Sequence, residues 1–550
     1  MKKILLIFNF IRPRRISLCS TFLFFMHSAF PQAGEWVWIK GDSIPNQPGN
    51  YGVQGVPSPT NNPPALYEPC EWTDLNGNFW MFGGNYNDLW KYDRITNEWT
   101  WVKGSGSIWD PGNYGTQGVP SPSNNPPGRG YGFASWVDTL GNFWMFGGSA
   151  VGGTKCDLWK YEIISNEWTW MKGSTIGNQP GIYGTQGVAN PSNNPGSRFE
   201  CVATWTDNNN DLWLFGGRDV VEDNFNDLWR YHIDSNQWTW MKGSQLTNQP
   251  GVYGTIGVEN SANTPCARGV YSRWKDNVGH LWLFAGFDTS NYLGFNDLWR
   301  YNPISNNWAC MGGNDSLGAP GVYGTKCFAS IYNLPGARFE NRASWIDQHG
   351  NFWFFGGGKG HNFSRVWNDL WMYCISLNQW IWQDGDSTSN PIGNWGTMGI
   401  SNPANKPDGR AGAVGWTDNN NHLYMFGGSI SPFPDKKNDL WKYTIDTTCG
   451  VCPTGTGIKE NNLPKADKLE VFPNPTNSSF TISFLSSEKQ TIELRIYNPL
   501  GKQVYFSREE IISEKFEKEI NAGNWSDGIY FLQLKTKDGN ISRKVMLTHP

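Results

Sequence analysis

Three short hydrophobic patterns recur along the chain in a fixed order. The first is an apolar run that ends in two glycines, as in residues 79–84; the second is Asp-Leu-Trp-x-Tyr; the third is a pair of tryptophans one residue apart, such as Trp99 and Trp101. The diglycine positions begin at 83, 147, 216, 285, 356 and 427, so successive copies are 64 to 71 residues apart, and only Ala285 departs from glycine. Such a period predicts an array of one supersecondary unit.

Each copy contains four predicted strands, named a to d in chain order. Strand a lies around a tryptophan such as Trp72, and a turn rich in Asn and Gly, residues 74–78, joins it to strand b. Asn and Gly adopt the positive φ of hairpin turns, so these strands should be antiparallel. In strand c, Trp90 and Tyr92 alternate with Leu89, which puts bulky side chains on both faces. A sheet loaded on both faces has to pack between two neighbours, as a blade of a β-propeller does.

The two ends of the repeat array complement each other. The last copy stops after strand c, at residues 439–443, while the first tryptophan pair, Trp36 and Trp38, precedes any strand a. We therefore expect the N-terminal strand to complete the last blade, which removes two exposed sheet edges. The predicted fold class is all-β, with a closed six-bladed propeller over residues 34–448 and a small C-terminal β-sandwich.

The repeated motifs resemble the kelch repeat, in six copies across residues 36–448. The resemblance implies a propeller but no activity, because kelch propellers act as enzymes, adhesins and adaptors. A relative such as galactose oxidase would need copper ligands from His and Tyr, and the histidines here are scattered, so we expect no copper site. The six-bladed sialic acid mutarotase and epimerase class would need an acid, a base and an arginine on the ring axis. The nearest candidates are Glu200, Glu340, Arg198 and Arg338.

The connections from b to c and from d to a are long in every copy, and both leave a blade on the same face. That loop-rich face is the expected binding face. Each d-to-a loop has a central aromatic residue, and strand a is usually preceded by an arginine. The candidate ligand-binding residues are Tyr51, Tyr114, Tyr183, Tyr253, Tyr323, Trp395, Arg129, Arg198, Arg268, Arg338 and Arg410.

Two interpretations of these residues stay open. The aromatic residues could stack on a sugar or peptide, or they could anchor each loop to a neighbouring blade. The arginines could bind an anion or carboxylate, or they could hold loop carbonyl groups. The first copy has Ala65 at the arginine position, so the arginine set is incomplete.

The net charge argues against nucleic-acid binding, and the N-terminal residues indicate export. With 44 basic and 48 acidic residues the formal charge is -4, so no broad positive field favours nucleic acid. Residues 1–33 read as a signal peptide, with Lys2 and Lys3, an apolar run over 16–26 and small residues near Ala33. We expect a mature chain without a transmembrane span.

Cysteines in an exported chain are expected to pair in part. Cys310 and Cys327 flank a single loop, and Cys449 and Cys452 follow the last repeat, so these are the pairs to test first. Connectivity cannot be read from sequence alone. No metal or other cofactor is predicted.

The composition changes after Cys452. Residues 449–467 read as a linker, and residues 468–550 form alternating strands with more charge and little tryptophan. Segments 469–475, 496–501 and 528–532 resemble the C-terminal sorting domain of type IX secretion substrates. The resemblance implies export across the outer membrane of a Bacteroidetes-type bacterium by the type IX machinery.

These patterns favour a secreted or surface-attached, non-enzymatic propeller that binds a glycan or protein on its loop-rich face. The alternative is a carbohydrate-active propeller enzyme. An enzyme should gather charged residues in one asymmetric pocket, whereas a binding module should present near-equivalent sites around the ring.

Overall fold

The computed structural model describes residues 33–269, 272–288, 293–313, 315–450, 452, 469–485, 489–498, 502–511, 515–536 and 539–548. The chain divides into two compact units, Met1–Pro453 and Thr454–Pro550. The expected signal peptide lies outside the described residues except for its last position, as does most of the expected linker.

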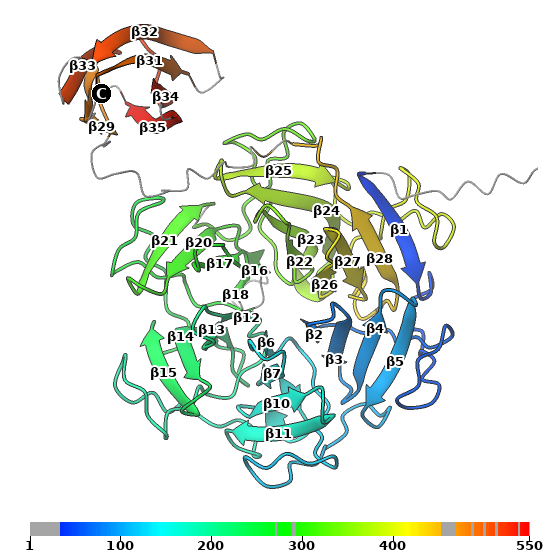
Figure 1. The fold of residues 1–550 in the computed structure, drawn as a ribbon. Coiled ribbons are helices and arrows are strands. Elements are labelled where there is room, and N and C mark those ends of the chain that lie inside the picture. The colour runs from blue at the N-terminus through cyan, green and yellow to red at the C-terminus, as the bar shows by residue number, and fades with distance from the viewer. Residues whose placement is uncertain are drawn as a thin grey trace, which may run out of the picture. The chain divides into compact units, whose positions relative to one another are not determined.

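The first unit is a ring of six four-stranded antiparallel sheets (Figure 1). The strands run from the axis outwards in the order a to d. Blade 1 is β2 (Pro69–Thr73), β3 (Phe79–Gly83), β4 (Leu89–Asp93) and β5 (Glu98–Lys103); blade 2 is β6 (Ala134–Val137), β7 (Phe143–Phe146), β10 (Leu158–Glu162) and β11 (Glu167–Lys172). Blade 3 is β12 (Ala203–Thr206), β13 (Leu212–Arg218), β14 (Asn224–His232) and β15 (Gln237–Lys242); blade 4 is β16 (Ser272–Lys275), β17 (Leu281–Phe284), β20 (Leu298–Asn302) and β21 (Asn307–Gly312).

Blade 5 is β22 (Ser344–Ile346), β23 (Phe352–Lys359), β24 (Arg365–Cys374) and β25 (Gln379–Asp384); blade 6 is β26 (Val414–Thr417), β27 (His422–Phe426), β28 (Leu440–Thr444) and β1 (Glu35–Lys40). Short hairpins, β8 (Ser149–Ala150) with β9 (Gly153–Thr154) and β18 (Phe287–Asp288) with β19 (Leu293–Gly294), and a 3-10 turn, η1 (His361–Phe363), lie in b-to-c connections. The predicted all-β fold is confirmed.

The N-terminal strand closes the ring as predicted. β1 pairs antiparallel with β28, with Trp36 opposite Tyr443 and Trp38 opposite Trp441. Trp36 is 1% exposed, and its indole donates to Asp384 Oδ2 of blade 5 at 3.1 Å. The first strand of the array therefore contributes to both blade 6 and its neighbour.

A repeated aspartate shapes every a-to-b turn. In blade 1, Asp74 Oδ1 accepts from the backbone N–H of Asn76 and Asn78, and Asp74 Oδ2 accepts from the indole of Trp80 at 2.8 Å. Such a side chain reproduces the bonds of a backbone turn and fixes the hairpin register. Equivalent aspartates stand at Asp138, Asp207, Asp276, Asp347 and Asp418.

Aromatic stacking between blades forms the core. Trp72 of blade 1 stacks on Phe143 of blade 2 with ring centroids 4.9 Å apart and planes at 4°, and Phe79 stacks on Trp416 of blade 6. Because each sheet buries both faces against neighbours, the alternation of bulky residues in strands b and c is explained.

The expected disulfide pairs are wrong. Cys327 pairs with Cys449 and Cys374 with Cys452, while Cys310 is a free, buried cysteine. After β28 the chain crosses to blade 5, which places Cys449 and Cys452 against partners 122 and 78 residues away in sequence rather than against each other.

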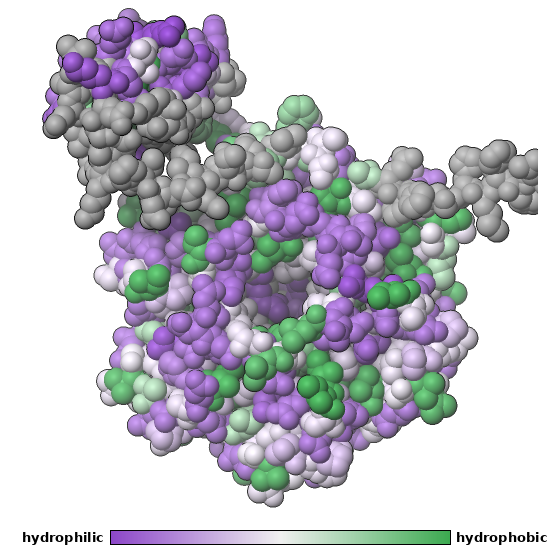
Figure 2. All heavy atoms as spheres, in the orientation of Figure 1, coloured by the Kyte–Doolittle hydropathy of each residue, from purple (hydrophilic) through white to green (hydrophobic). Residues whose placement is uncertain are grey.

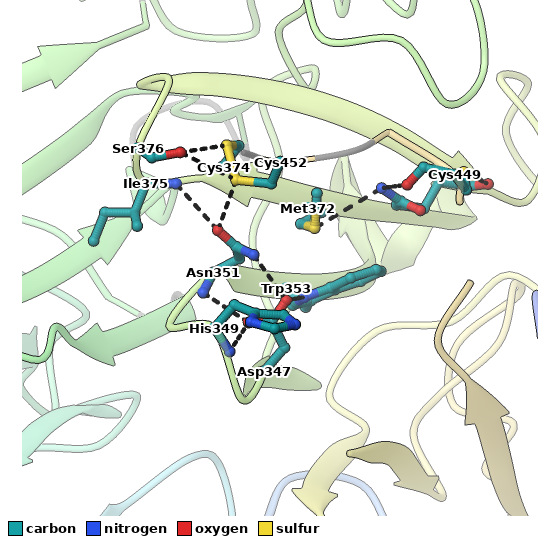
Figure 3. The surroundings of a disulfide bond; sticks show 11 residues. Asp347, His349, Asn351, Trp353, Met372, Cys374, Ile375, Ser376, Cys449 and Cys452 are labelled. Atoms are coloured by element: carbon teal, nitrogen blue, oxygen red, sulfur yellow. Dashed lines mark hydrogen bonds between the residues drawn. A yellow bond between two sulfur atoms is a disulfide. The ribbon is translucent and has the colours of Figure 1, made fainter. Parts of the chain in front are cut away.

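Figure 3 shows the second of these bridges at the end of β24. Asn351 Oδ1 lies 3.0 Å from Cys452 Sγ, and the side-chain amide of Asn351 donates to Asp347 Oδ2, the turn aspartate of blade 5, at 3.0 Å. The segment that leaves the ring is thus covalently fastened to blade 5.

The second unit has two sheets around one apolar core. β29 (Leu469–Phe472), β30 (Ser479–Leu485) and β33 (Lys515–Asn521) form one sheet, and β32 (Gln503–Ile511), β31 (Gln490–Tyr497), β34 (Gly528–Thr536) and β35 (Gly539–Leu547) form the other. Phe480 and Ile482 from the first sheet and Leu494 and Leu532 from the second belong to one buried cluster.

Candidate functional site

The long d-to-a loops lie along the outer strand of the next blade. In blade 1, the N–H of Gly55 donates to the carbonyl of Trp101 at 2.8 Å, and Asn61 Nδ2 donates to the carbonyl of Trp99 at 3.0 Å. The pattern repeats around the ring. The loops therefore cover edge strands that would otherwise present unpaired backbone groups.

The central aromatic residue of each loop packs on the blade that the loop covers. The hydroxyl of Tyr183 donates to Asp227 Oδ2 at 2.7 Å, and its ring lies 4.9 Å from Trp229 and 5.3 Å from Trp240. An equivalent hydrogen bond, to the aspartate of Asp-Leu-Trp-x-Tyr, is made by the hydroxyls of Tyr51, Tyr114, Tyr253 and Tyr323. In the sixth loop, Trp395 packs against Trp38 and Trp441. These rings are half-buried, and a role in ligand binding stays a prediction.

The arginines before strand a form buried ion pairs with the aspartate of Asp-Leu-Trp-x-Tyr. Arg198 Nη1 and Nη2 lie 2.7 and 2.9 Å from the two carboxylate oxygens of Asp227, and both side chains are fully buried. The other pairs are Arg129 with Asp157, Arg268 with Asp297, Arg338 with Asp369 and Arg410 with Asp439. In blade 1 the arginine position is taken by Leu66 and not by Ala65, because one residue fewer separates this position from the inner tryptophan than in blades 2, 3 and 5. Burial raises the pKa of Asp88 in that blade. Ligand binding by these arginines stays a prediction.

A cavity of about 550 Å³ occupies the ring axis. Figure 2 shows the ring hollowed at its centre, with hydrophilic atoms inside. Its wall is formed by the inner tryptophan of each blade and by the residues on either side of that tryptophan. These flanking residues are Glu71, Ser135, Thr204, Arg273, Ser344 and Gly415 before it, and Thr73, Val137, Thr206, Lys275, Ile346 and Thr417 after it.

Three charged side chains from different blades form ion pairs at this axis. Arg273 Nη2 lies 3.0 Å from Glu71 Oε1, and Arg342 Nη2 lies 2.9 Å from Glu71 Oε2. Arg342 precedes Ser344 by two residues and is fully buried, so it stands one layer deeper than the cavity wall. These three charged residues were not singled out from the sequence. A signal was present, because most copies have a hydroxyl residue or glycine directly before the inner tryptophan, whereas Glu71 and Arg273 are charged.

Behind Arg342 lies a buried acidic cluster. Glu68, Glu200 and Glu340 come from blades 1, 3 and 5 and have φ values of 53°, 49° and 56°. The hydroxyl of Tyr67 donates to Glu340 in a short hydrogen bond, and Arg218 lies 3.0 Å from Glu200. Positive φ at non-glycine residues stores strain, and such strain is common at functional sites.

The structure places the four sequence candidates for the ring axis in two different environments. Glu200 and Glu340 lie in the acidic cluster, whereas Arg198 and Arg338 are bound to the aspartates of their own blades. The arginines that pair with glutamates near the axis are Arg218, with Glu200, and Arg342, with Glu71.

An aromatic cluster adjoins the acidic cluster through the Tyr67–Glu340 hydrogen bond. The ring of Tyr67 contacts Phe363 and Phe433, and Phe287 and Phe339 belong to the same cluster. Phe363 and Phe433 come from the b-to-c connections of blades 5 and 6. All three glutamates of the acidic cluster are buried.

Burial strongly perturbs this cluster. Both carboxylate oxygens of Glu68 lack a hydrogen-bond partner within the described part of the chain. Burial, with the nearby charge of Glu200, raises the pKa of Glu68 to about 8, although Arg342 and Arg218 act in the opposite direction. Burial likewise raises the pKa of Glu200 and, well above its usual range, that of Glu340.

Glu68→Gln is expected to flatten the pH dependence of stability. The unfolded chain loses this proton near pH 4.5 and the folded chain near pH 8, so wild-type stability falls between these values by roughly 1.4 kcal/mol per pH unit from this group. Glutamine does not titrate, so the variant should gain in melting temperature relative to wild type from pH 5 to pH 8. A constant difference between the two melting temperatures across that range would contradict the assignment.

Within the described residues, no group of three or more His, Cys, Asp or Glu side chains is arranged to hold a metal ion. The helical content of the described chain includes nothing of the length and apolarity that a bilayer crossing requires.

Comparison with known families identifies the tail. The family model of the secretion system C-terminal sorting domain matches residues 470–548, which make up most of the second unit. No curated protein sequence matches the chain. The protein is therefore a secreted or cell-surface protein that carries a type IX sorting domain and engages that secretion machinery.

Proposed function

We propose that the propeller is a kelch-type binding module for a glycan and that the axial cavity is the binding site. The single observation that carries this is the composition of the cavity wall. Six hydroxyl side chains surround one Glu71–Arg273 ion pair, with Lys275 beside them. A volume of about 550 Å³ lies in the range of small-ligand sites.

The proposed binding site lies at the ring axis and not on the loop-rich face that the sequence favoured. On that face the tyrosine hydroxyls and the arginines bond to aspartates of the protein itself. At the axis, the hydroxyls of Thr204, Thr206 and Thr417 donate to backbone carbonyls of a neighbouring blade and can still accept a hydrogen bond. The hydroxyls of Thr73, Ser135 and Ser344 also line the cavity, and a hydroxyl can both donate and accept, which matches the alternating donors and acceptors of a sugar.

Binding is favoured over catalysis because the acidic side chains are sealed. Glu68 is fully buried, and Glu200 and Glu340 are less than a tenth exposed. A bound sugar in the cavity meets Glu71 and Arg273 first.

A glycan array with the mature full chain, followed by titration calorimetry, tests the site. Arg273→Gln should weaken binding of a retained glycan by about 10-fold or more, because hydrogen bonds to a charged group contribute about 1.5–3 kcal/mol. Glu71 keeps its bond to Arg342 in this variant, so the axis should stay folded.

The matched control is Tyr183→Phe, which removes a hydroxyl from the loop-rich face and should leave affinity unchanged. If Tyr183→Phe weakens glycan binding and Arg273→Gln does not, the binding site lies on the loop-rich face and not at the axis. If no glycan is retained, the proposed ligand class fails.

One observation favours a second candidate, a carbohydrate-active enzyme. Glu68 carries a raised pKa beside the Tyr67–Glu340 pair, and a carboxyl that is protonated near neutral pH can act as a general acid. Product formation from a retained glycan that is abolished in Glu68→Gln, with binding preserved, would support it.

A further inference from the structure

The d-to-a loop of blade 5 departs from its five counterparts at exposed positions. Phe328, Ile331 and Tyr332 are 66%, 66% and 75% exposed. Counting from the central tyrosine, the corresponding residues of the blade 2 loop are Val119, Pro122 and Ser123. The other copies have Val or Ile at the first of these positions and Pro, Ser, Thr or Ala at the other two, so the fold does not require the two aromatic side chains. We call Phe328, Ile331 and Tyr332 the blade 5 knob.

The two loops nevertheless follow the same backbone path. Asn333 Nδ2 donates to the carbonyls of Phe328 and Trp380 at 2.7 and 3.0 Å, and Asn124 Nδ2 makes the equivalent bonds in blade 2. Only the exposed side chains change, which marks the knob as an addition to a conserved internal scaffold.

A covalent bridge holds the loop that carries the knob. Cys327, adjacent to Phe328, is bound to Cys449 and has φ 68°, at the position where blade 2 has Gly118 with φ 77°. A cysteine in this conformation is unfavourable unless the bridge compensates. The bridge fixes the knob before any partner arrives, which reduces the entropy lost on binding.

The chemistry of the knob points to a protein surface. The polar groups around it are already engaged, because Lys326 Nζ lies 3.1 Å from Asp384 and Ser330 Oγ accepts from the N–H of Tyr332 at 3.2 Å. Sugar recognition needs several directional polar contacts, whereas a protruding aromatic and aliphatic group fits an apolar recess.

The chain itself offers a recess on blade 3 whose rim is apolar and whose wall also contains polar residues such as Gln179 and Asp219. A groove of about 510 Å³ lies between the loop around Pro180 and the connection that precedes β14. Its apolar rim includes Val220, Val221 and Leu246, which are 49%, 70% and 68% exposed. We call this the blade 3 groove.

We propose that the blade 5 knob of one copy of the chain inserts into the blade 3 groove of a second copy. A buried aromatic side chain removes roughly 150–250 Å² from water. Phe328 and Tyr332 are 66% and 75% exposed, so they supply roughly 210–350 Å² of the ~800 Å² per partner in a standard interface, and Ile331 and the flanking loop residues supply the rest. Because knob and groove lie on different blades, the contact is head-to-tail and links successive molecules into a ring or an open chain. This inference is independent of the axial site.

Sedimentation velocity of the full mature chain tests the contact. Wild type should associate with rising concentration. A knob variant, Phe328→Val with Ile331→Pro and Tyr332→Ser, copies the blade 2 loop and should therefore fold but stay monomeric. A groove variant, Val221→Asp with Leu246→Asp, should also be monomeric. Mixing the two variants should restore one dimer and no larger species, since one intact knob and one intact groove remain.

A matched control removes equally exposed apolar side chains elsewhere. Ile164→Ser with Ile304→Ser, at fully exposed turns between strands c and d, should leave association unchanged. The proposal is overturned if wild type is monomeric at about 100 μM, where a contact of micromolar Kd is populated, if the knob variant associates like wild type, or if the mixture gives no dimer. A knob that instead serves a different protein would produce the first of these results.

Discussion

Replacing Arg198 by methionine is expected to lower the free energy of unfolding of the propeller by about 3–5 kcal/mol, the usual penalty for removing one partner of a buried ion pair. The guanidinium binds both oxygens of Asp227 and the carbonyl of Gly216, and neither charged side chain is exposed. Without it, the carboxylate of Asp227 stays buried, and its remaining side-chain donors among the described residues are the Tyr183 hydroxyl and the Trp229 indole. Equilibrium unfolding in guanidinium chloride, monitored by tryptophan fluorescence, measures the change in the free energy of unfolding.

The double variant Arg198→Met with Asp227→Asn separates the buried charge from lost packing. It removes the uncompensated carboxylate, so it should recover much of the loss. A single variant that unfolds at the wild-type midpoint would show that the Arg198–Asp227 ion pair is not required for stability.

Trp36→Ala is expected to open blade 6 locally and to cost about 3–5 kcal/mol, as other truncations of a buried tryptophan do. The ring of Trp36 is fully buried, contacts Tyr443 and Phe355, and belongs to the core shared by blades 5 and 6. Its loss should weaken the β1–β28 pairing that joins the two ends of the array. Hydrogen exchange should then show faster exchange of amides in β28.

Trp38→Ala is the matched control, because Trp38 lies on the same strand but is half-buried. It should cost less and leave β28 protected. If Trp36→Ala destabilises the protein while β28 exchange stays at the wild-type rate, ring closure does not depend on this strand.

Much of the fold was predictable because it is encoded locally. Each hairpin is specified by an Asx turn of five residues, such as Asp74 to Asn78, and each strand by alternation within about six residues. Six copies of one local code leave few arrangements that bury both faces of every sheet. The unpaired Trp36 and Trp38 then identify the closing strand.

The candidate site was much less predictable. The loop tyrosines and arginines stand out in sequence because they repeat, but the structure commits their polar groups to the aspartates of Asp-Leu-Trp-x-Tyr. The residues at the axis stand out only as departures from the repeat, such as Glu71 and Arg273. Repetition is a signal of the fold, whereas asymmetry is a signal of the site.

From the sequence alone come the strand order, the number of blades, the closing strand and the export tail, because these depend on neighbours within one repeat or on a contiguous motif. Only the tertiary structure decides which distant side chains meet. Glu68, Glu200 and Glu340 are brought together by ring closure, and Cys327 and Cys374 find their partners because the chain crosses back to blade 5 after β28. These contacts join residues separated by 78 to 272 positions (272 is the difference between 340 and 68), over which no local pattern acts.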